Sequence, residues 1–302
     1  MELRNDGFRL PPPWIAPAAG KTDREVRPVI YVSRRRPPSG GGKIIATGGS
    51  LVFEIAGYRV HVFNVPGSYA FDVTVGGADL EYLIRGAGAG GSRSFWGGGG
   101  GGGGGHRSSV PGEPSGGGSS AEPRLIVTPQ QYIVVVGAKG LGAPASGSFF
   151  GTPGGNSSFA GIQALGGGPG GVAGVFGSGG GTNYASSLTQ GVGPPGTGTA
   201  GQGRNGGAIY DRGSVYGGGG GGGAAQPGNG QVSGLDGRGG DGLASSITGA
   251  PVPGCGGGGA GGVGGGGVGG LGSNGPGGGG KGSATGAAQN GQDGGVIIRY
   301  PI

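Results

Sequence analysis

Residues 294–300 read Gly-Gly-Val-Ile-Ile-Arg-Tyr, and this stretch decides how the rest of the chain is interpreted. The run is apolar and β-branched, which favours a β-strand. It follows about 150 residues that are dominated by glycine. A low-complexity tail would end without a β-strand, whereas a glycine-rich insertion inside a β-sandwich would be followed by a further strand of that sandwich. We therefore predict a β-sandwich that contains the glycine-rich region as an insertion.

Alternating apolar and polar residues predict the other strands of this sandwich. The expected strands cover residues 51–55, 58–63, 69–75, 80–85, 124–128 and 131–136. The dipeptides Ala56-Gly57, Pro66-Gly67 and Gly76-Gly77 separate the first four strands, as expected for turns between short antiparallel strands.

The composition alone is typical of a disordered chain, because 94 of the 302 residues are glycine and 22 are proline. Only 11% of the residues are charged, however, which is too few to keep a coil extended by repulsion. Glycine does not recur strictly every third residue, so a collagen triple helix is excluded. Order in another form is therefore expected.

The glycine tracts are not expected to be helical, because glycine disfavours a helix by about 1 kcal/mol per residue relative to alanine. We therefore expect them to form extended rods. A polyglycine-II rod makes no internal hydrogen bonds, so its amides must pair with neighbouring rods. We predict an all-β fold: a small antiparallel β-sandwich that encloses a bundle of polyglycine-II rods, with essentially no α-helix. The expected domain spans residues 44–302, and the bundle spans about 86–123 and 137–295.

Residues 1–43 are predicted to form an extended attachment arm that is rich in proline and arginine. It contains at most one short strand, at residues 29–32. Such an arm has little core of its own, so a partner is needed to order it. The candidate attachment residues are Trp14, Tyr31, Arg34, Arg35 and Arg36. The three arginines fit an acidic neighbour or a nucleic acid, and they fit a solvated basic linker equally well.

The sequence offers little for catalysis or cofactor binding. Cys255 is the single cysteine, the two histidines have no Cys or Asp cluster near them, and no nucleophile and base pair is apparent. We expect no enzyme activity, no cofactor and no metal. The beginning of the chain lacks a signal-peptide pattern, and no apolar run is long enough for a membrane span. The net charge of +6 is modest for this length and does not imply nucleic-acid binding.

Several short motifs, in this order, resemble the glycine-rich domains of bacteriophage tail and tail-fibre proteins. They are a Val-Pro-Gly turn at 65–67, a strand that runs into glycine at 82–91, a Thr-Pro hairpin at 128–138, a Ser-Ser-Phe box at 157–161, and the strand at 294–300. The chain is also similar to the tip adhesins of T-even-like long tail fibres. The resemblance implies a virion structural protein, made and assembled in the host cytoplasm and located in the tail tip, baseplate or tail fibre. Its implied partners are other tail proteins in a symmetric assembly and a host receptor.

Aromatic and charged residues within the glycine tracts are the candidate receptor contacts: Trp96, Tyr184, Tyr210, Arg212 and Tyr216. Phe95 with His106 and Arg107, and the pair Phe149 and Phe150, belong to the same class of contact. Alternatively, the Phe and Trp side chains plug the ends of the bundle. His61 is expected to be an ordinary strand residue, and Cys255 an unreactive space-filler.

Two other functions compete with the tail protein. A free-standing glycine-rich structural or ice-binding-type protein would show a regular tripeptide repeat and a threonine-rich face, and neither is evident. An RNA-binding protein would carry many Gly-Arg-Gly-Gly copies, whereas residues 237–240 stand nearly alone.

Overall fold

The computed structural model describes residues 43–146, 149–183, 194–209, 217–231, 236–262 and 267–302. Except for its last residue, Lys43, the predicted arm lies outside the described residues, and so do the predicted strand at 29–32 and residues Trp14, Tyr31, Arg34, Arg35 and Arg36. Within the described part the fold is all-β with antiparallel main sheets, which confirms the expected fold class; the one helical element there is a short 3₁₀ turn at Gly116–Gly118.

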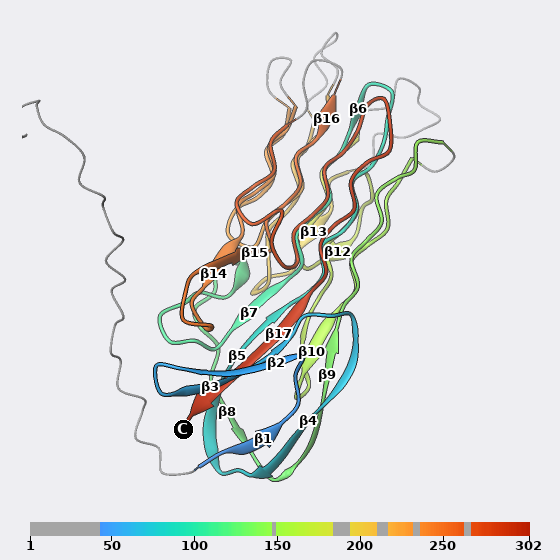
Figure 1. Ribbon diagram of the computed structural model, residues 1–302. Coiled ribbons are helices and arrows are strands. Elements are labelled where there is room, and N and C mark those ends of the chain that lie inside the picture. Colours follow the sequence, from blue (N-terminus) through green and yellow to red (C-terminus); the bar gives the residue numbers. More distant parts are fainter. Residues whose placement is uncertain (1–42, 147–148, 184–193, 210–216, 232–235, 263–266) are drawn as a thin grey trace, which may run out of the picture. The chain divides into compact units, whose positions relative to one another are not determined.

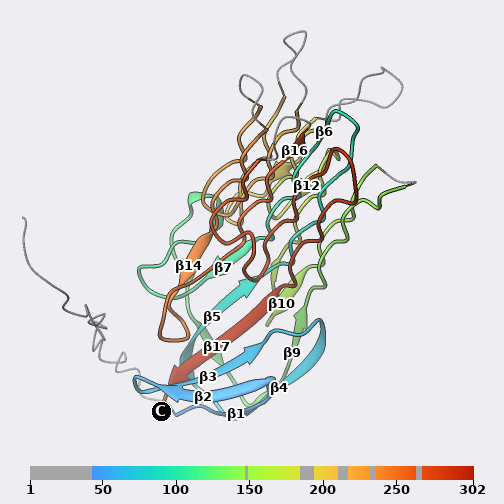
Figure 2. The same cartoon turned by 45° about the horizontal axis from the view of Figure 1, so that its top comes forward.

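Two antiparallel sheets face each other and form the sandwich (Figures 1 and 2). In spatial order, the six-stranded sheet consists of β2 (Leu51–Ile55), β3 (Tyr58–Phe63), β17 (Gly295–Pro301), β5 (Ala78–Arg85) and β7 (His106–Ser108), with β8 (Leu125–Val127) on another part of β5. The five-stranded sheet consists of β1 (Ile45–Thr47), β4 (Gly67–Val75), β9 (Gln130–Val136), β10 (Ser157–Phe159) and β11 (Ile162–Ala164). Every strand predicted at 51–85, 124–136 and 296–300 is present.

Strand β17 lies in the middle of the six-stranded sheet. Its register pairs Ile298 with His61 of β3 on one side and with Tyr82 of β5 on the other. Val296, Ile298 and Tyr300 are buried while the residues between them are only partly buried. This alternation is that of a strand with one face on the core. The strand therefore closes the sandwich, as its sequence predicts.

Aromatic side chains from both sheets fill the core between them. The ring of Phe71 makes edge contacts with Phe63 across the sandwich and with Phe159 beside it. Such edge-to-face pairs stabilise a core beyond the apolar area that they bury. The core continues through buried aliphatic residues of both sheets: Val73, Leu80, Ile84, Val134, Val136, Val296 and Ile298.

Two tight hairpins place alanine in the left-handed region. Ala56 and Gly57 join β2 to β3 with φ of 49° and 81°, and Ala160 and Gly161 join β10 to β11 with φ of 49° and 80°. Two consecutive positive φ values are those of the type I′ turn, which matches the twist of antiparallel strands. The β10–β11 hairpin lies within the Ser-Ser-Phe box, a motif whose strands were not among those expected.

The glycine-rich segments continue from one end of the sandwich and lie side by side (Figures 1 and 2). Short strand pairs connect some of them: β12 (Val175–Phe176) with β13 (Thr197–Gly198), β14 (Leu243–Ser245) with β15 (Val252–Gly254), and β16 (Gly261–Gly262) with β6 (Gly97–Gly98). We call these segments together the glycine layer; its described residues are 86–105, 137–146, 149–156, 165–183, 194–209, 217–231, 236–262 and 267–294.

Hydrogen bonds in the glycine layer repeat every three residues. Six successive amides, those of residues 100–105, donate to three neighbouring segments in turn. Their acceptors, at N to O distances of 2.7–3.0 Å, are the carbonyl oxygens of Gly219, Gly280, Gly168, Gly222, Gly277 and Leu165. Each neighbour thus accepts from every third residue, as expected for an extended segment with three residues per turn.

Close approach between backbones explains why these positions are glycine. A Cβ on Gly100 would lie 2.0 Å from the carbonyl oxygen of Gly258, which is far inside van der Waals contact. Alanine at position 100 would therefore push two backbones apart, and neither can yield without breaking hydrogen bonds to further segments.

Candidate functional site

Phe95 and Trp96 lie in a tight loop, residues 93–98, at one end of the glycine layer. Ser92 closes this loop: its N–H donates to the Gly99 carbonyl (2.9 Å), and its Oγ accepts from the Gly99 N–H (2.7 Å). Gly97 and Gly98 then form β6 and pair with β16. Both views place β6 and β16 at the end of the glycine layer that is remote from strands β2, β3 and β8 of the sandwich (Figures 1 and 2).

Arg93 joins two aromatic rings at this end. The central carbon of its guanidinium group lies 4.7 Å from the ring centroid of Phe149 and 5.8 Å from that of Phe95. The two rings are in edge contact, with centroids 6.0 Å apart. We call Arg93, Phe95 and Phe149 the aromatic cluster. Its cation–π contacts hold the two rings in a fixed relative orientation.

The backbone also fixes the aromatic cluster. The Arg93 N–H donates to the Phe149 carbonyl at 2.8 Å. Ser283 bridges the same loop: its N–H donates to the Ser92 carbonyl at 3.0 Å, and its carbonyl accepts from the Ser94 N–H at 3.1 Å. Three segments that are distant in sequence therefore position the cluster, so its rings are held by the glycine layer itself.

Exposure and charge suit the aromatic cluster for recognition. Phe95 is 64% exposed, whereas Arg93 is buried, and its Nε has no hydrogen-bond partner in the described part of the chain. No carboxylate of the described residues forms an ion pair with Arg93. Aromatic residues and arginine are both enriched at protein interfaces.

The predicted receptor contacts fall into two groups. Trp96 is half-buried and lies in the 93–98 loop, directly beside the aromatic cluster. Tyr184, Tyr210, Arg212 and Tyr216 lie outside the described residues. The described residues at the borders of residues 210–216 and 263–266 do lie close to β6: Gly262 pairs with Gly97, and a Cβ on Gly97 would lie 2.4 Å from the carbonyl carbon of Gly217.

His106 and Arg107 do not belong to this site, which corrects their grouping with Phe95 and Trp96. They are residues of β7 in the six-stranded sheet, where His106 is fully buried and pairs in register with Arg85. Arg107 forms an ion pair with Glu122 at 2.7 Å. The chain between Trp96 and His106 is an extended run of glycine, so residues that are close in sequence lie far apart along the layer.

Phe149 and Arg93 were brought together by the fold and not by sequence. The sequence groups Phe149 with its neighbour Phe150, and Arg93 has no feature in the sequence that marks it as a contact residue. The glycine tracts have nearly the same sequence, so the sequence does not show which tracts are neighbours in the layer. No local signal therefore predicts that Arg93 and Phe149 are in contact.

His61 and Cys255 are structural residues. His61 is buried in the core; its Nδ1 lies 2.7 Å from the Gly48 carbonyl, and its Nε2 lies 3.0 Å from the Tyr300 hydroxyl. Cys255 is buried in the glycine layer, and burial raises the pKa of its thiol to about 11. The expectation that His61 is an ordinary strand residue is confirmed, and Cys255 fills space in the layer as expected; its lack of reactivity remains a prediction.

Among the residues that the structure describes, no group of three or more His, Cys, Asp and Glu side chains could hold a metal ion. No described helix is long and apolar enough to cross a membrane.

The sequence model of one protein family, described as a glycine-rich domain, matches residues 64–301. The match begins at the end of β3 and runs to the end of β17, so it includes most of the sandwich and the entire glycine layer. No sequence among the curated proteins matches the chain. Because the matched region covers well over half of its length, this chain belongs to the glycine-rich domain family.

Proposed function

We propose that this chain is a structural protein of a bacteriophage tail tip, baseplate or tail fibre. Residues 1–43 attach it to other virion proteins, and the end of the glycine layer that carries the aromatic cluster contacts the host surface. In this proposal the glycine layer is a bundle of polyglycine-II rods that holds the cluster at a fixed distance from the sandwich.

The three-residue repeat of hydrogen bonds is the observation that carries the proposal. An extended segment whose amides pair with three neighbours in turn is restrained on several sides. A bundle of this kind is stiff although it contains almost no side chains. Stiffness suits a component that must present a contact surface and resist force, and it contributes nothing to turnover of a substrate.

The aromatic cluster supplies the second support. Exposed aromatic rings and arginine contribute much of the energy at recognition surfaces. Phe95 and Trp96 lie next to β6, at the end remote from strands β2, β3 and β8, and so do Gly217 and Gly262, each of which borders one of the segments 210–216 and 263–266. The motif resemblance to phage tail proteins described above provides the biological setting.

Adsorption to host cells tests the contact surface. Phages that carry Phe95→Ala together with Phe149→Ala are expected to adsorb at least tenfold more slowly, while the particles assemble normally. Ile126→Ala is the matched control, because Ile126 is a similarly exposed apolar residue on β8 of the sandwich. Equal adsorption rates for the two variants would show that the aromatic cluster does not contact the host surface.

Particle assembly tests the attachment arm. Deletion of residues 1–43 is expected to leave a folded protein that is missing from purified particles. Normal incorporation of the shortened chain would refute the role of the arm. A free-standing structural or ice-binding-type protein, the competing function, predicts that the chain is absent from particles whether or not residues 1–43 are present.

A further inference from the structure

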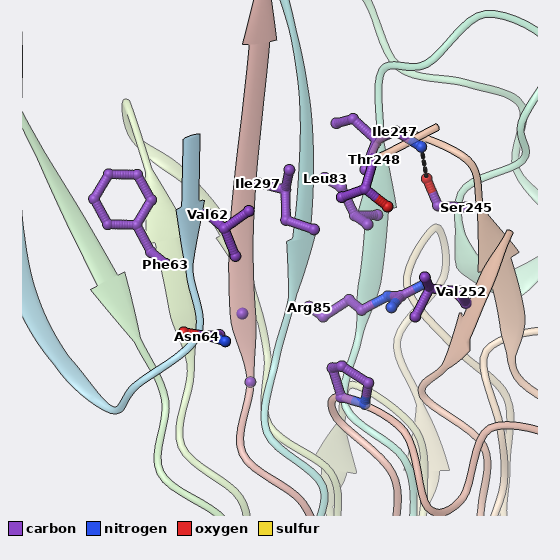
Figure 3. A pocket seen from close by; sticks show the side chains of 13 residues that line it. Val62, Phe63, Asn64, Leu83, Arg85, Ser245, Ile247, Thr248, Val252 and Ile297 are labelled. Carbon is purple, nitrogen blue, oxygen red and sulfur yellow. Dashed lines mark hydrogen bonds between the residues drawn. The ribbon is translucent and has the colours of Figure 1, made fainter. Parts of the chain in front are cut away.

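A pocket of about 180 Å³ lies between the six-stranded sheet and the β14–β15 hairpin (Figure 3). Leu83 of β5, Ile297 of β17 and Val62 of β3 line it from the sheet, and Ile247 and Val252 line it from the hairpin. Figure 3 shows Arg85 reaching across the pocket from β5 towards Val252. The pocket is thus an apolar space with one basic side chain in its wall.

Arg85 is only 3% exposed, yet it has no carboxylate partner. Its Nη2 donates to the carbonyl oxygens of Val252 (2.8 Å) and Leu243 (3.3 Å), and its Nε donates to Nδ1 of His106 at 3.4 Å. A guanidinium group has five N–H donors, so the two on Nη1 remain without a hydrogen-bond partner among the described residues. No Asp or Glu oxygen of those residues forms an ion pair with it.

None of the described ionisable groups around Arg85 forms an ion pair with it, although the charge of the Glu113 carboxylate acts on it through space and favours its protonated form. Burial and the positive charge of Arg85 hold the pKa of His106 well below its usual value, so this imidazole is neutral. Burial likewise keeps the Cys255 thiol protonated. The Glu113 carboxylate is occupied by the hydroxyl groups of Ser245 and Ser246, both at 2.6 Å, and by the Ser246 N–H at 2.8 Å.

A buried cation without a contacting anion is costly, and an anionic ligand that pairs with it offsets that cost. Arginine prefers carboxylates, because its planar group can donate two parallel hydrogen bonds to the two oxygens. The apolar walls favour a hydrocarbon body. An apolar protein cavity of about 150 Å³ can bind benzene, so the volume here suits a body of about that size.

We propose that this pocket binds a small monocarboxylate with a compact apolar body, with the carboxylate on Arg85 and the hydrocarbon against Leu83, Ile247 and Ile297. The inference does not depend on the function proposed above. The competing interpretation is that Arg85 serves only to fasten the β14–β15 hairpin to β5 and that the pocket holds water.

Benzoate is a suitable probe, with benzyl alcohol as the uncharged ligand of similar size. Calorimetric titration of the full chain is expected to show that benzoate binds at least tenfold more tightly than benzyl alcohol. The Arg85→Met variant is expected to lose this preference while it retains binding of benzyl alcohol. Equal affinity for both ligands, or no benzoate binding at about 10 mM, would overturn the proposal.

A second variant keeps the test decisive if Arg85→Met fails to fold. Val252 is partly exposed at the pocket, so Val252→Trp is expected to fill the space without removing the backbone carbonyl that accepts from Arg85. This variant should lose both ligands and keep its melting temperature. Val175→Trp, an exposed position outside the pocket, is the matched control and should bind benzoate normally. Unchanged benzoate affinity in Val252→Trp would also contradict the proposal.

Discussion

The imidazole of His61 stacks on the phenol ring of Tyr300: the ring centroids are 5.5 Å apart, the planes are 27° apart, and Nε2 lies 3.0 Å from the hydroxyl oxygen. The Gly48 carbonyl can only accept a hydrogen bond, so Nδ1 of His61 carries the hydrogen and Nε2 accepts from Tyr300. A neutral histidine is thereby built into the core between β3 and β17.

This arrangement predicts that acid destabilises the fold. Burial lowers the pKa of His61 and of His106, which are the two histidines of the chain. In the unfolded chain both imidazoles become protonated as the pH falls through about 6.5. In the folded protein they stay neutral at that pH, so below it the unfolded state binds more protons than the folded state. The free energy of unfolding, measured with urea, should fall between pH 7 and pH 5 by at most about 1.4 kcal/mol per pH unit for each histidine.

Variants separate the two contributions. His61→Gln and His106→Gln should each give a smaller pH dependence than the natural chain, whatever their absolute stability. A slope that is the same in all three proteins would show that other groups cause it.

Replacement of Glu81 should be strongly destabilising. Its carboxylate accepts from Arg299 at 2.6 Å and 2.7 Å and from Arg124 at 3.1 Å, and its side chain is buried. Glu81→Gln leaves Arg299 partly buried without its anion, which should lower the free energy of unfolding by about 3 kcal/mol. The control Glu54→Gln breaks the exposed pair with Arg59 and should cost far less, because solvent screens that pair. Similar losses in the two variants would contradict this account.

A single methyl group in the glycine layer should be costly. Gly100→Ala would place its Cβ 2.0 Å from the Gly258 oxygen, so we expect a loss of about 1–3 kcal/mol in thermal or urea unfolding. Gly286→Ala is the matched control, because no atom lies within 4 Å of the added Cβ there. If Gly100→Ala is as stable as the control, the close packing of the layer is refuted.

Asparagine at position 56 should stabilise the protein. Ala56 has a φ of 49° in an exposed type I′ turn, and asparagine tolerates this conformation better than alanine does. We expect Ala56→Asn to add about 0.5–1 kcal/mol, as optimised turn residues commonly do. Ala287→Asn, at another exposed alanine without positive φ, should be neutral. A lower melting temperature for Ala56→Asn would argue against this turn geometry.

The thiol of Cys255 should report opening of the glycine layer. It is fully buried with a pKa of about 11, so a disulfide reagent at pH 8 should react with it only after the layer opens. In a Thr285→Cys variant the added, exposed thiol should react within seconds while Cys255 stays protected. Rapid reaction of both thiols in the folded protein would indicate a loose layer.

Sequence reasoning was most successful where strands are long enough to alternate. The seven predicted strands appear within two residues of their expected ends, because each places several apolar side chains on one core face. The three-residue strands β1, β10 and β11 escaped prediction because so few residues show no periodicity. Their positions are fixed by pairing with β4 and β9, which is a tertiary effect.

The candidate site was only partly predictable. Trp96 and Phe149 stood out as aromatic residues among glycines, but their neighbours depend on which extended segments lie side by side. Arg85 illustrates the same limit. It ends an apolar strand and looks like an ordinary solvated strand end, whereas the β14–β15 hairpin, more than 150 residues later, covers it.

The central position of β17 has a consequence for protein synthesis. Its two neighbours, β3 and β5, leave the ribosome about 200 residues earlier, so a growing chain exposes an unfilled gap in the sheet throughout translation of the glycine-rich region. Pairing across so long a separation folds slowly, and open strand edges invite aggregation. Such nascent chains are natural clients for chaperones, and a product truncated before residue 295 cannot complete the sheet and becomes a substrate for proteolysis.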